Sequence, residues 1–292
     1  MKPAPFDYHR PETLDEVISL MGEHADEARP LAGGQSLAAL MNTRLLQPSV
    51  LIDLGHVAGL DRIIVTPESV RLSAMTRQAT AEHDAALFRA APLMRAALHH
   101  VGAVSHRNRG TVCGSLAHAD SVAELPCVAV ALDAVFTING PRGPRDVPAE
   151  EFFFGPLSTA LDSDEILEGV TFTQAPPRSL AAFTEVRRNQ LHGFAIVGVG
   201  AQLSFAEDGT CETARLAVMG VDDVPVRLRD AEDVLTGADL SPATLARVAE
   251  ACALDIEFRA DIHASAAYRR SQVRALTQRA LAEIHSKSES LQ

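Results

Sequence analysis

The stretch RPLAGGQSLAALMNTRL, residues 29–45, places two adjacent glycines between a short apolar segment and a candidate amphipathic helix. The apolar residues of that helix recur at helical spacing: Leu37, Leu40, Met41 and Leu45. Residues 49–54, SVLIDL, follow as a candidate buried strand, so the pattern predicts strand, turn, helix, strand. At the turn, 32–36, glycines let the backbone approach a ligand, and successive N–H groups at a helix start favour an anion. An ordinary strand-to-helix turn fits these residues equally well.

A second run of small residues, GTVCGS at 110–115, also precedes an apolar segment. Two such loops, each able to offer several backbone amides, are better explained by a ligand with two linked phosphates than by chance. The surrounding segment, HRNRGTVCGSLAHAD at 106–120, contains so many turn formers that we predict a loop rather than a helix or strand.

The rest of the chain predicts a change in the arrangement of helices and strands at a linker near residue 175. Thr13 and Glu16 form a capping box that predicts a helix to about residue 21. Further helices are predicted at 79–87, 92–99 and 122–134, and strands at 69–75 and 134–140. The consecutive prolines of TQAPPRS, 173–179, indicate a linker. Beyond it we predict an α+β unit with three strands and two helices: 181–188, 194–205, 214–221, 242–253 and 266–284.

Composition narrows the function classes. A chain of 292 residues is long enough for about two domains. The formal net charge of -12 disfavours nucleic acid as a partner. The four cysteines lie far apart without a CxxC pair, which argues against zinc, an iron–sulfur cluster or disulfides in this chain. A redox centre is therefore expected to be an organic cofactor or to belong to a partner. No signal peptide or membrane span is indicated, and we expect a cytoplasmic protein.

Other motifs were weighed against the paired loops. Neither GxGxxG nor GxxxxGK[ST] occurs, and GVGAQL at 198–203 lacks the third glycine of the dinucleotide motif. Residues 34–38, GQSLA, resemble a nucleophile elbow with Ser36 as nucleophile, although a hydrolase would leave the second loop unexplained.

Several polar residues near the second loop have more than one possible role. His99, His100, His106 and His118 with Asp120 lack a metal-ligand spacing, so no metal site is expected. Arg107 and Arg109 are either solvated charges or partners for phosphate or another subunit. Asp120 and Glu124 either favour a helix start or accept hydrogen bonds from sugar hydroxyls, and the spacing favours the second use for at least one.

Four segments together resemble one family: FDYHRPETLDE, PLAGGQSL, RNRGTVCGSLAHADSVAELP and FTEVRR with FAIVGVGAQL. They are similar to the FAD-binding medium subunit of molybdenum hydroxylases, which includes subunits of carbon monoxide, nicotine and nicotinate dehydrogenases and the middle domain of xanthine dehydrogenase. The resemblance implies an α+β fold. A two-part FAD-binding domain of the vanillyl-alcohol-oxidase (PCMH) type would occupy 1–175, with subdomains of about 1–57 and 58–175. A C-terminal α+β domain with a small antiparallel sheet would occupy 178–287.

The resemblance also implies a cofactor site in which the two glycine loops hold the FAD pyrophosphate, mainly through backbone amides. The first loop would comprise Arg29, Pro30, Leu31, Ala32, Gly33, Gly34, Gln35 and Ser36, and the second Thr111, Val112, Cys113, Gly114 and Ser115. Further positions that would contact or lie near the cofactor are Val101, Glu124, Leu167 and Glu185. These are binding roles, and no catalytic residue is expected in this chain.

Three features depart from the family pattern. Cys113 stands where relatives usually have glycine, so a left-handed backbone there would cost roughly 1 kcal/mol, or the thiol would lie near the flavin. Glu185 stands where some relatives have lysine. Residues 187–195, RRNQLHGFA, have one extra residue and lack the usual Gly-Asp, which bears on the placement of Arg187 and Phe194 near the flavin.

The resemblance implies partners as well. A small subunit with two [2Fe-2S] clusters would deliver electrons, and a large subunit with the molybdenum cofactor would hydroxylate the organic substrate. The flavin would pass electrons in pairs to an external acceptor, namely NAD, oxygen or a quinone. Two alternatives are a stand-alone flavin oxidoreductase of the same fold and an assembly scaffold that has lost FAD.

Overall fold

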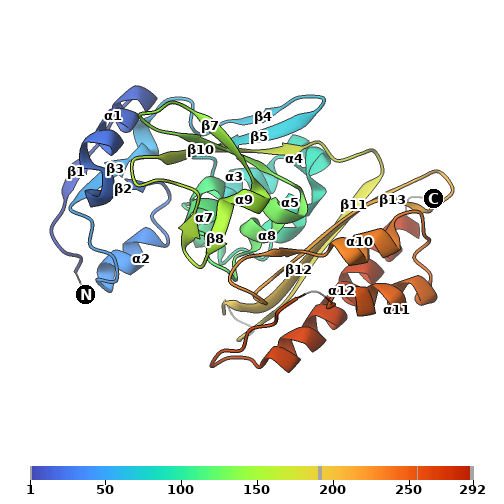
Figure 1. Ribbon diagram of the computed structural model, residues 1–292. Helices are drawn as coiled ribbons and strands as arrows, with labels where there is room; N and C mark the ends of the chain where they lie inside the picture. Colours follow the sequence, from blue (N-terminus) through green and yellow to red (C-terminus); the bar gives the residue numbers. More distant parts are fainter. Residues whose placement is uncertain (1, 190–192, 255, 290–292) are drawn as a thin grey trace.

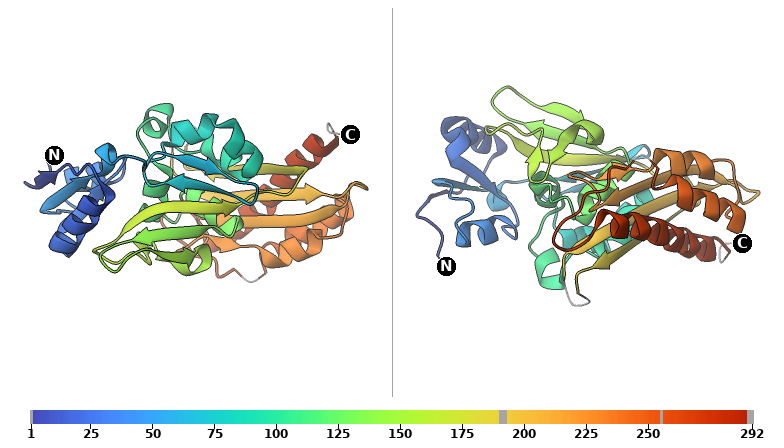
Figure 2. Two further views of the ribbon diagram at one scale, coloured as in Figure 1. Left: turned by 90° about the horizontal axis from the view of Figure 1, so that it is seen from above. Right: turned by 60° about the horizontal axis from the view of Figure 1, so that its bottom comes forward.

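The computed structural model describes residues 2–189, 193–254 and 256–289. These residues form three main sheets that follow one another along the chain (Figure 1). The first sheet lies at the N-terminal end of the molecule and the third at the opposite end, as the two further views also show (Figure 2). The α+β fold class is therefore confirmed.

The first sheet is parallel, with strand order β1-β3-β2. Its strands and helices are β1 (Asp7–His9), α1 (Leu14–His24), η1 (Ala25–Glu27), β2 (Ala28–Leu31), α2 (Leu37–Asn42), β3 (Val50–Asp53) and η2 (Leu54–His56). The predicted capping box is present, since the Glu16 amide donates to the Thr13 hydroxyl at 3.2 Å and the Thr13 amide donates to the Glu16 carboxylate at 3.4 Å. The strand–turn–helix–strand prediction for 29–54 is confirmed.

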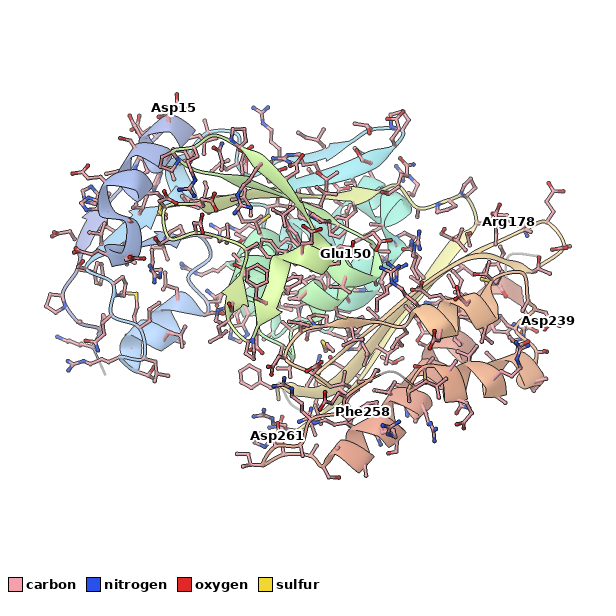
Figure 3. All side chains as sticks on the ribbon, in the orientation of Figure 1. Asp15, Glu150, Arg178, Asp239, Phe258 and Asp261 are labelled. Atoms are coloured by element: carbon pink, nitrogen blue, oxygen red, sulfur yellow. The ribbon has the colours of Figure 1, made fainter. Side chains whose placement is uncertain are left out.

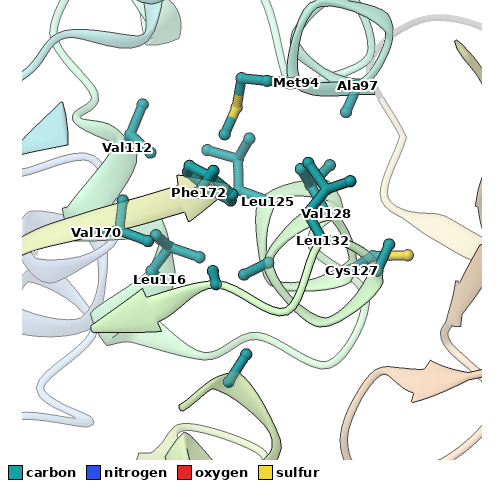
Figure 4. Packing of buried hydrophobic residues seen from close by; sticks show 14 of the residues in the cluster. Met94, Ala97, Val112, Leu116, Leu125, Cys127, Val128, Leu132, Val170 and Phe172 are labelled. Atoms are coloured by element: carbon teal, nitrogen blue, oxygen red, sulfur yellow. The ribbon is translucent and has the colours of Figure 1, made fainter. Parts of the chain in front are cut away.

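The second sheet is antiparallel, with order β4-β5-β10-β6-β7. Its strands are β4 (Ile63–Val65), β5 (Ser69–Ser73), β6 (Val135–Asn139), β7 (Arg145–Pro148) and β10 (Ile166–Thr173). The helices inserted between them are α3 (Gln78–His83), α4 (Ala85–Ala90), α5 (Pro92–Leu98), α6 (Val104–Arg107), α7 (Val112–His118), α8 (Glu124–Ala131) and α9 (Ala149–Phe152). A small hairpin, β8 (Phe153–Gly155) with β9 (Ser158–Thr159), completes this part. Its core packs Met94 of α5, Leu125 of α8 and Phe172 of β10 together (Figure 4).

The third sheet is antiparallel, with order β11-β12-β13-β14. It contains β11 (Ser179–Arg187), β12 (Ala195–Phe205), β13 (Cys211–Met219) and β14 (Val226–Arg227), and the helices after it are α10 (Arg229–Leu235), α11 (Pro242–Ala251) and α12 (Ala266–Glu289). Because side chains alternate along a strand, Ala181 and Phe183 join the core of the second part, whereas Ala182 joins the core under α10–α12. The sheet is thus buried on both faces (Figure 1).

The linker is fixed to the body of the protein. The Gln174 amide donates to the Glu68 carbonyl at 2.8 Å, and the Ala175 amide donates to the Ala90 carbonyl at 2.7 Å. Across the junction, Gln202 of β12 accepts a hydrogen bond from the Leu93 amide at the start of α5, at 3.1 Å. The third sheet therefore holds α5 through a polar contact as well as through packing.

Three local predictions were wrong. The segment 106–120 contains α7, because Thr111 caps a helix whose residues Val112 and Leu116 are fully buried. The predicted helix 79–87 is broken at Asp84, whose carboxylate caps α4 instead. Leu45 lies beyond the end of α2 and is 78% exposed.

None of the helices formed by the described residues is both long enough and apolar enough to cross a bilayer.

Candidate functional site

The first glycine loop joins β2 to α2 and consists of residues 32–36. Gly34 adopts φ 69°, a left-handed conformation that glycine tolerates without strain. No described residue accepts a hydrogen bond from the amides of Gly33, Gly34, Gln35 or Ser36. The loop therefore presents consecutive backbone donors next to a helix start, as an anion site requires.

The second glycine loop is partly used by its own fold. The Val112 amide donates to the Thr76 carbonyl at 3.0 Å, and the Gly114 amide donates to the Thr111 hydroxyl at 3.0 Å. The Ser115 amide donates to the Thr111 carbonyl at 3.2 Å. Among the described residues, the amides of Thr111 and Cys113 have no backbone acceptor. The resemblance implied that this loop binds the cofactor mainly through backbone amides. Fewer of its amides are free for that role than this expectation requires.

The two loops lie directly against each other. A Cβ atom on Gly33 would lie 2.7 Å from the Cα of Gly110 and closer still to the carbonyl oxygen of Arg109. A Cβ atom on Gly114 would lie 3.8 Å from the Cβ of Ala32. Only a residue without a side chain allows this approach at Gly33. The fold therefore brings together the two loops at Gly33 and Gly110, which lie 77 positions apart in the sequence.

Three residues of the expected first loop lie in a strand instead. Arg29, Pro30 and Leu31 belong to β2 and pair with β3. The Arg29 guanidinium donates to the carbonyls of Asp26 at 3.1 Å and Ala28 at 2.6 Å, so it is bound locally. The loop itself begins at Ala32, because the parallel pairing with β3 extends as far as Leu31.

The structure decides between the two readings of Arg107. Its side chain is 9% exposed and binds Glu82 with two hydrogen bonds, of 2.7 and 3.0 Å. Its Nη1 donates to the carbonyls of Val101 at 3.0 Å and Gly102 at 3.1 Å. Arg107 therefore fixes the segment that carries Val101. Arg109 is exposed, and its carbonyl accepts a hydrogen bond from Arg77.

Cys113 does not have a left-handed backbone. It lies inside α7 and is absent from the positive-φ positions of the described chain. Its thiol contacts the Leu72 carbonyl at 3.7 Å in the core, and burial raises its pKa to about 12. The side chain is therefore an inert core group, and only the Cys113 amide remains a candidate donor toward a ligand.

A second group of polar residues lies where α5 ends against β11. Glu185 has a side chain that is 3% exposed, and its Oε1 contacts the Nδ1 of His100 at 3.2 Å and the guanidinium of Arg187. Arg187 also donates to the His100 carbonyl at 2.5 Å. The Oε2 atom of Glu185 is buried and has no hydrogen-bond partner among the described residues. A buried carboxylate oxygen without a donor is costly, so it indicates a place where a bound group could donate.

Glu124 faces this group from the first residue of α8. Burial, and then the nearby Glu185 carboxylate, raise the pKa of Glu124 to about 7. Arg187 and His100 act in the opposite direction. Two carboxylates, a guanidinium and an imidazole thus interact at the junction between the second and third sheets.

The Glu124 carboxyl gives stability a specific pH dependence. Because its pKa is raised in the folded protein, its contribution is fully present below about pH 4.5 and is lost as pH rises through about 7. We expect Glu124→Gln to match the unchanged chain at pH 4.5 and to be more stable by about 2–4 kcal/mol at pH 8. Urea unfolding midpoints of both chains across this range measure the difference. A constant difference at every pH would contradict the assignment.

The other residues that were expected to contact the cofactor lie near the glycine loops and near the polar residues around Glu185. Val101 is partly buried and packs against the core of the second part, and Leu167 is 5% exposed in β10 at an irregularity in its pairing with β6. Residues 99–115 connect the His100 group to the second glycine loop. Phe194 is 65% exposed, with its ring 5.8 Å from the Arg188 guanidinium. The unusual segment around residues 190–192 lies outside the described residues.

The competing motifs gain no support from the geometry. No described residue hydrogen-bonds the Ser36 hydroxyl, so the general base that a nucleophile elbow needs is not in place. His99 contacts Glu82 at 3.2 Å, and His106 accepts a hydrogen bond from the Ala103 amide. Within the described residues, no group of three potential metal ligands was found.

Sequence reasoning missed two residues that support the second loop. The Gln78 amide donates to the Gly110 carbonyl at 2.9 Å, and its side chain donates to the Thr111 carbonyl at 3.3 Å. Arg77 binds the Arg109 carbonyl. No periodicity or motif marks these residues, because their role depends only on tertiary contacts.

Two family models match the chain. One, described as the FAD binding domain in molybdopterin dehydrogenase, matches residues 4–174. The other, described as the CO dehydrogenase flavoprotein C-terminal domain, matches residues 181–284.

Individual proteins are similar over almost the whole length. The nicotine 6-hydroxylase medium subunit of Paenarthrobacter nicotinovorans is 38% identical over 283 residues, which cover 97% of this chain and 98% of that protein. The 6-hydroxypseudooxynicotine dehydrogenase complex subunit alpha of the same organism is 34% identical, covering 97% and 95%. A chain of quinoline 2-oxidoreductase from Pseudomonas putida 86 superposes with a TM-score of 0.92 at 34% identity, covering 99% of each chain.

Proposed function

Because the chain belongs to the family of FAD-binding medium subunits of molybdopterin dehydrogenases, we propose that it takes electrons from a [2Fe-2S] partner subunit and passes them to an external acceptor. The chain is an oxidoreductase subunit with an FAD-binding domain, and its relatives are subunits of multi-subunit enzymes. The observation that carries the proposal is the contact between the two glycine loops at Gly33.

The residues present fit the FAD that the family implies. The approach of Gly33 to Arg109 and Gly110 forms a cradle that one Cβ atom would fill. The free amides of residues 33–36 suit the oxygens of a pyrophosphate. The partnerless Oε2 of Glu185 suits a hydrogen-bond donor, which the flavin ring has. The pyrophosphate in the middle of FAD and the flavin at one end thus both find complementary groups.

We assign the roles of this chain's residues accordingly. Gly33, Gly34, Gln35 and Ser36 bind the pyrophosphate through their amides, assisted by those of Thr111 and Cys113. Arg107 positions Val101 by holding its carbonyl. Glu185 and Glu124 lie on the flavin side, where Arg187 and His100 keep the Glu185 carboxylate in place. When bound, FAD supplies the exchange between single-electron and two-electron transfer.

The partners follow from the same reasoning. The cysteines of the chain are free and buried at Cys113, Cys127, Cys211 and Cys252, so they do not supply cluster ligands. We assign the [2Fe-2S] clusters to a small subunit and the molybdenum cofactor to a large one, with NAD, oxygen or a quinone as acceptor. We place the FAD-binding domain at 1–175 and the C-terminal domain at 178–287, in a cytoplasmic protein.

An absorbance spectrum of the purified chain tests the proposal. We expect non-covalent FAD at close to one per chain, released by heat and identified by chromatography. Two further polypeptides should co-purify from the native source, one with iron and one with molybdenum. A colourless chain that cannot be reconstituted with FAD would favour the scaffold alternative. FAD-loaded chain that purifies alone and reduces its own substrate would favour the stand-alone oxidoreductase.

A further inference from the structure

A groove with a volume of about 1230 Å³ lies between α4, α5, the linker, the first half of β11 and the last turns of α12. Arg178, one of its lining residues, lies where the linker enters β11 (Figure 3). Its lining includes no residue of either glycine loop. The groove is therefore separate from the cradle assigned to the FAD pyrophosphate, but at one end it reaches His100, which contacts Glu185 on the flavin side.

The charge of the groove differs from that of the chain. Carboxylates outnumber Lys and Arg by 38 to 26 over the whole sequence. In the groove the order is reversed, with four cations against two carboxylates: Arg89, Arg95, Arg178 and Lys287 against Glu68 and Glu283. A local cationic surface on an acidic protein attracts anions and orients them.

Two of these cations are free to bind a ligand. Lys287 contacts Glu283 at 2.7 Å and also donates to the Ala181 carbonyl. Arg95 stacks on the ring of Phe88, with its guanidinium carbon 4.5 Å from the ring centre. Among the described residues, Arg89 and Arg178 pair with neither a carboxylate nor an aromatic ring. These two guanidinium groups come from α4 and from the linker.

The groove also offers apolar surface on a fixed frame. Phe88, Pro92, Leu180 and Phe183 supply apolar and aromatic area. The linker that forms one wall is held by the hydrogen bond from the Ala175 amide to α4. Pockets that combine an apolar wall with a few charged groups are typical small-molecule sites.

We propose that this groove binds a phosphate-bearing nucleotide, with Arg89 and Arg178 on the phosphates and the apolar wall against the base. Arginine forms paired hydrogen bonds with phosphate oxygens and stacks on planar rings, so it serves both parts of such a ligand. The volume exceeds what a single inorganic anion needs. This site goes beyond the electron-transfer function and does not depend on it.

Calorimetric titration of the full chain with ADP tests the proposal, both without FAD and with FAD in excess. With FAD in excess we expect saturable binding of one ADP, in the groove, whereas without FAD a second ADP can bind at the pyrophosphate cradle. Arg89→Gln and Arg178→Gln should each weaken it at least about tenfold, the size expected for loss of a charge-assisted contact. Arg247→Gln, an exposed arginine of α11 outside the groove, is the matched control and should leave it unchanged. Adenosine, which lacks the phosphates, should bind at least about tenfold more weakly than ADP.

Three results would overturn the proposal. One is the absence of saturable ADP binding once FAD is in excess. Another is an equal loss in Arg247→Gln and Arg89→Gln, which would indicate general charge attraction. The third is loss of partner subunits from the purified complex with Arg89→Gln, together with no ADP binding by that complex, which would make the groove a protein interface.

Discussion

Gly33→Ala is expected to weaken FAD binding by about 10- to 100-fold, the equivalent of the 1–3 kcal/mol that overpacking costs at a tight contact. The added Cβ atom would meet the Arg109 carbonyl and the Cα of Gly110, and both belong to backbone that cannot rotate away. The two loops would have to separate. A pyrophosphate that contacts both loops at once would then lose its fit to one of them. Quenching of FAD fluorescence on titration with the FAD-free chain measures the affinity.

Gly155→Ala is the matched control for this change. A Cβ atom on Gly155 would meet nothing within 4 Å, and the residue has no positive φ. Its affinity for FAD should equal that of the unchanged chain. Thermal unfolding of both FAD-free variants separates lost binding from lost folding. If Gly33→Ala folds and binds FAD as tightly as Gly155→Ala, the loops do not form the cofactor site.

The sequence predicted those elements whose signals are local. The Thr13–Glu16 capping box and the Ser241–Pro242 helix start are both present, because each depends on residues three or fewer positions apart. The β2–turn–α2 unit was predictable from its apolar spacing and adjacent glycines. In contrast, the turn-forming composition of 106–120 predicted a loop where α7 lies. The helix forms there because the burial of Val112 and Leu116 outweighs that composition.

The candidate site was only partly predictable for the same reason. The two glycine loops could be recognised as a pair, but their contact at Gly33 is a tertiary feature that no spacing encodes. The alternatives for Arg107 could not be separated until Glu82, 25 residues earlier, was placed beside it. The partnerless oxygen of Glu185 depends on the packing of β11 against the end of α5.

Arg107→Ala is expected to destabilise the protein by about 3–5 kcal/mol, which is the usual effect of breaking a buried ion pair. Burial by itself would raise the pKa of Glu82, but the hydrogen bonds and charge of Arg107 outweigh it and hold that pKa below its usual value. Without Arg107, the buried carboxylate of Glu82 keeps only its contact with His99, and the carbonyls of Val101 and Gly102 lose their donor. Chemical unfolding at pH 7 measures the change in free energy.

Two comparisons show whether the effect comes from the unpaired charge. Arg229→Ala breaks an ion pair with Glu150 whose side chains are 62% and 68% exposed, and it should cost less than about 1 kcal/mol. Glu82→Gln combined with Arg107→Met should recover much of the stability lost in Arg107→Ala, because neither charge is then buried alone. A double variant as unstable as Arg107→Ala would instead assign the loss to the two carbonyls. In that case the main role of Arg107 is to hold the segment carrying Val101, and weakened FAD binding should accompany the loss of stability in both variants.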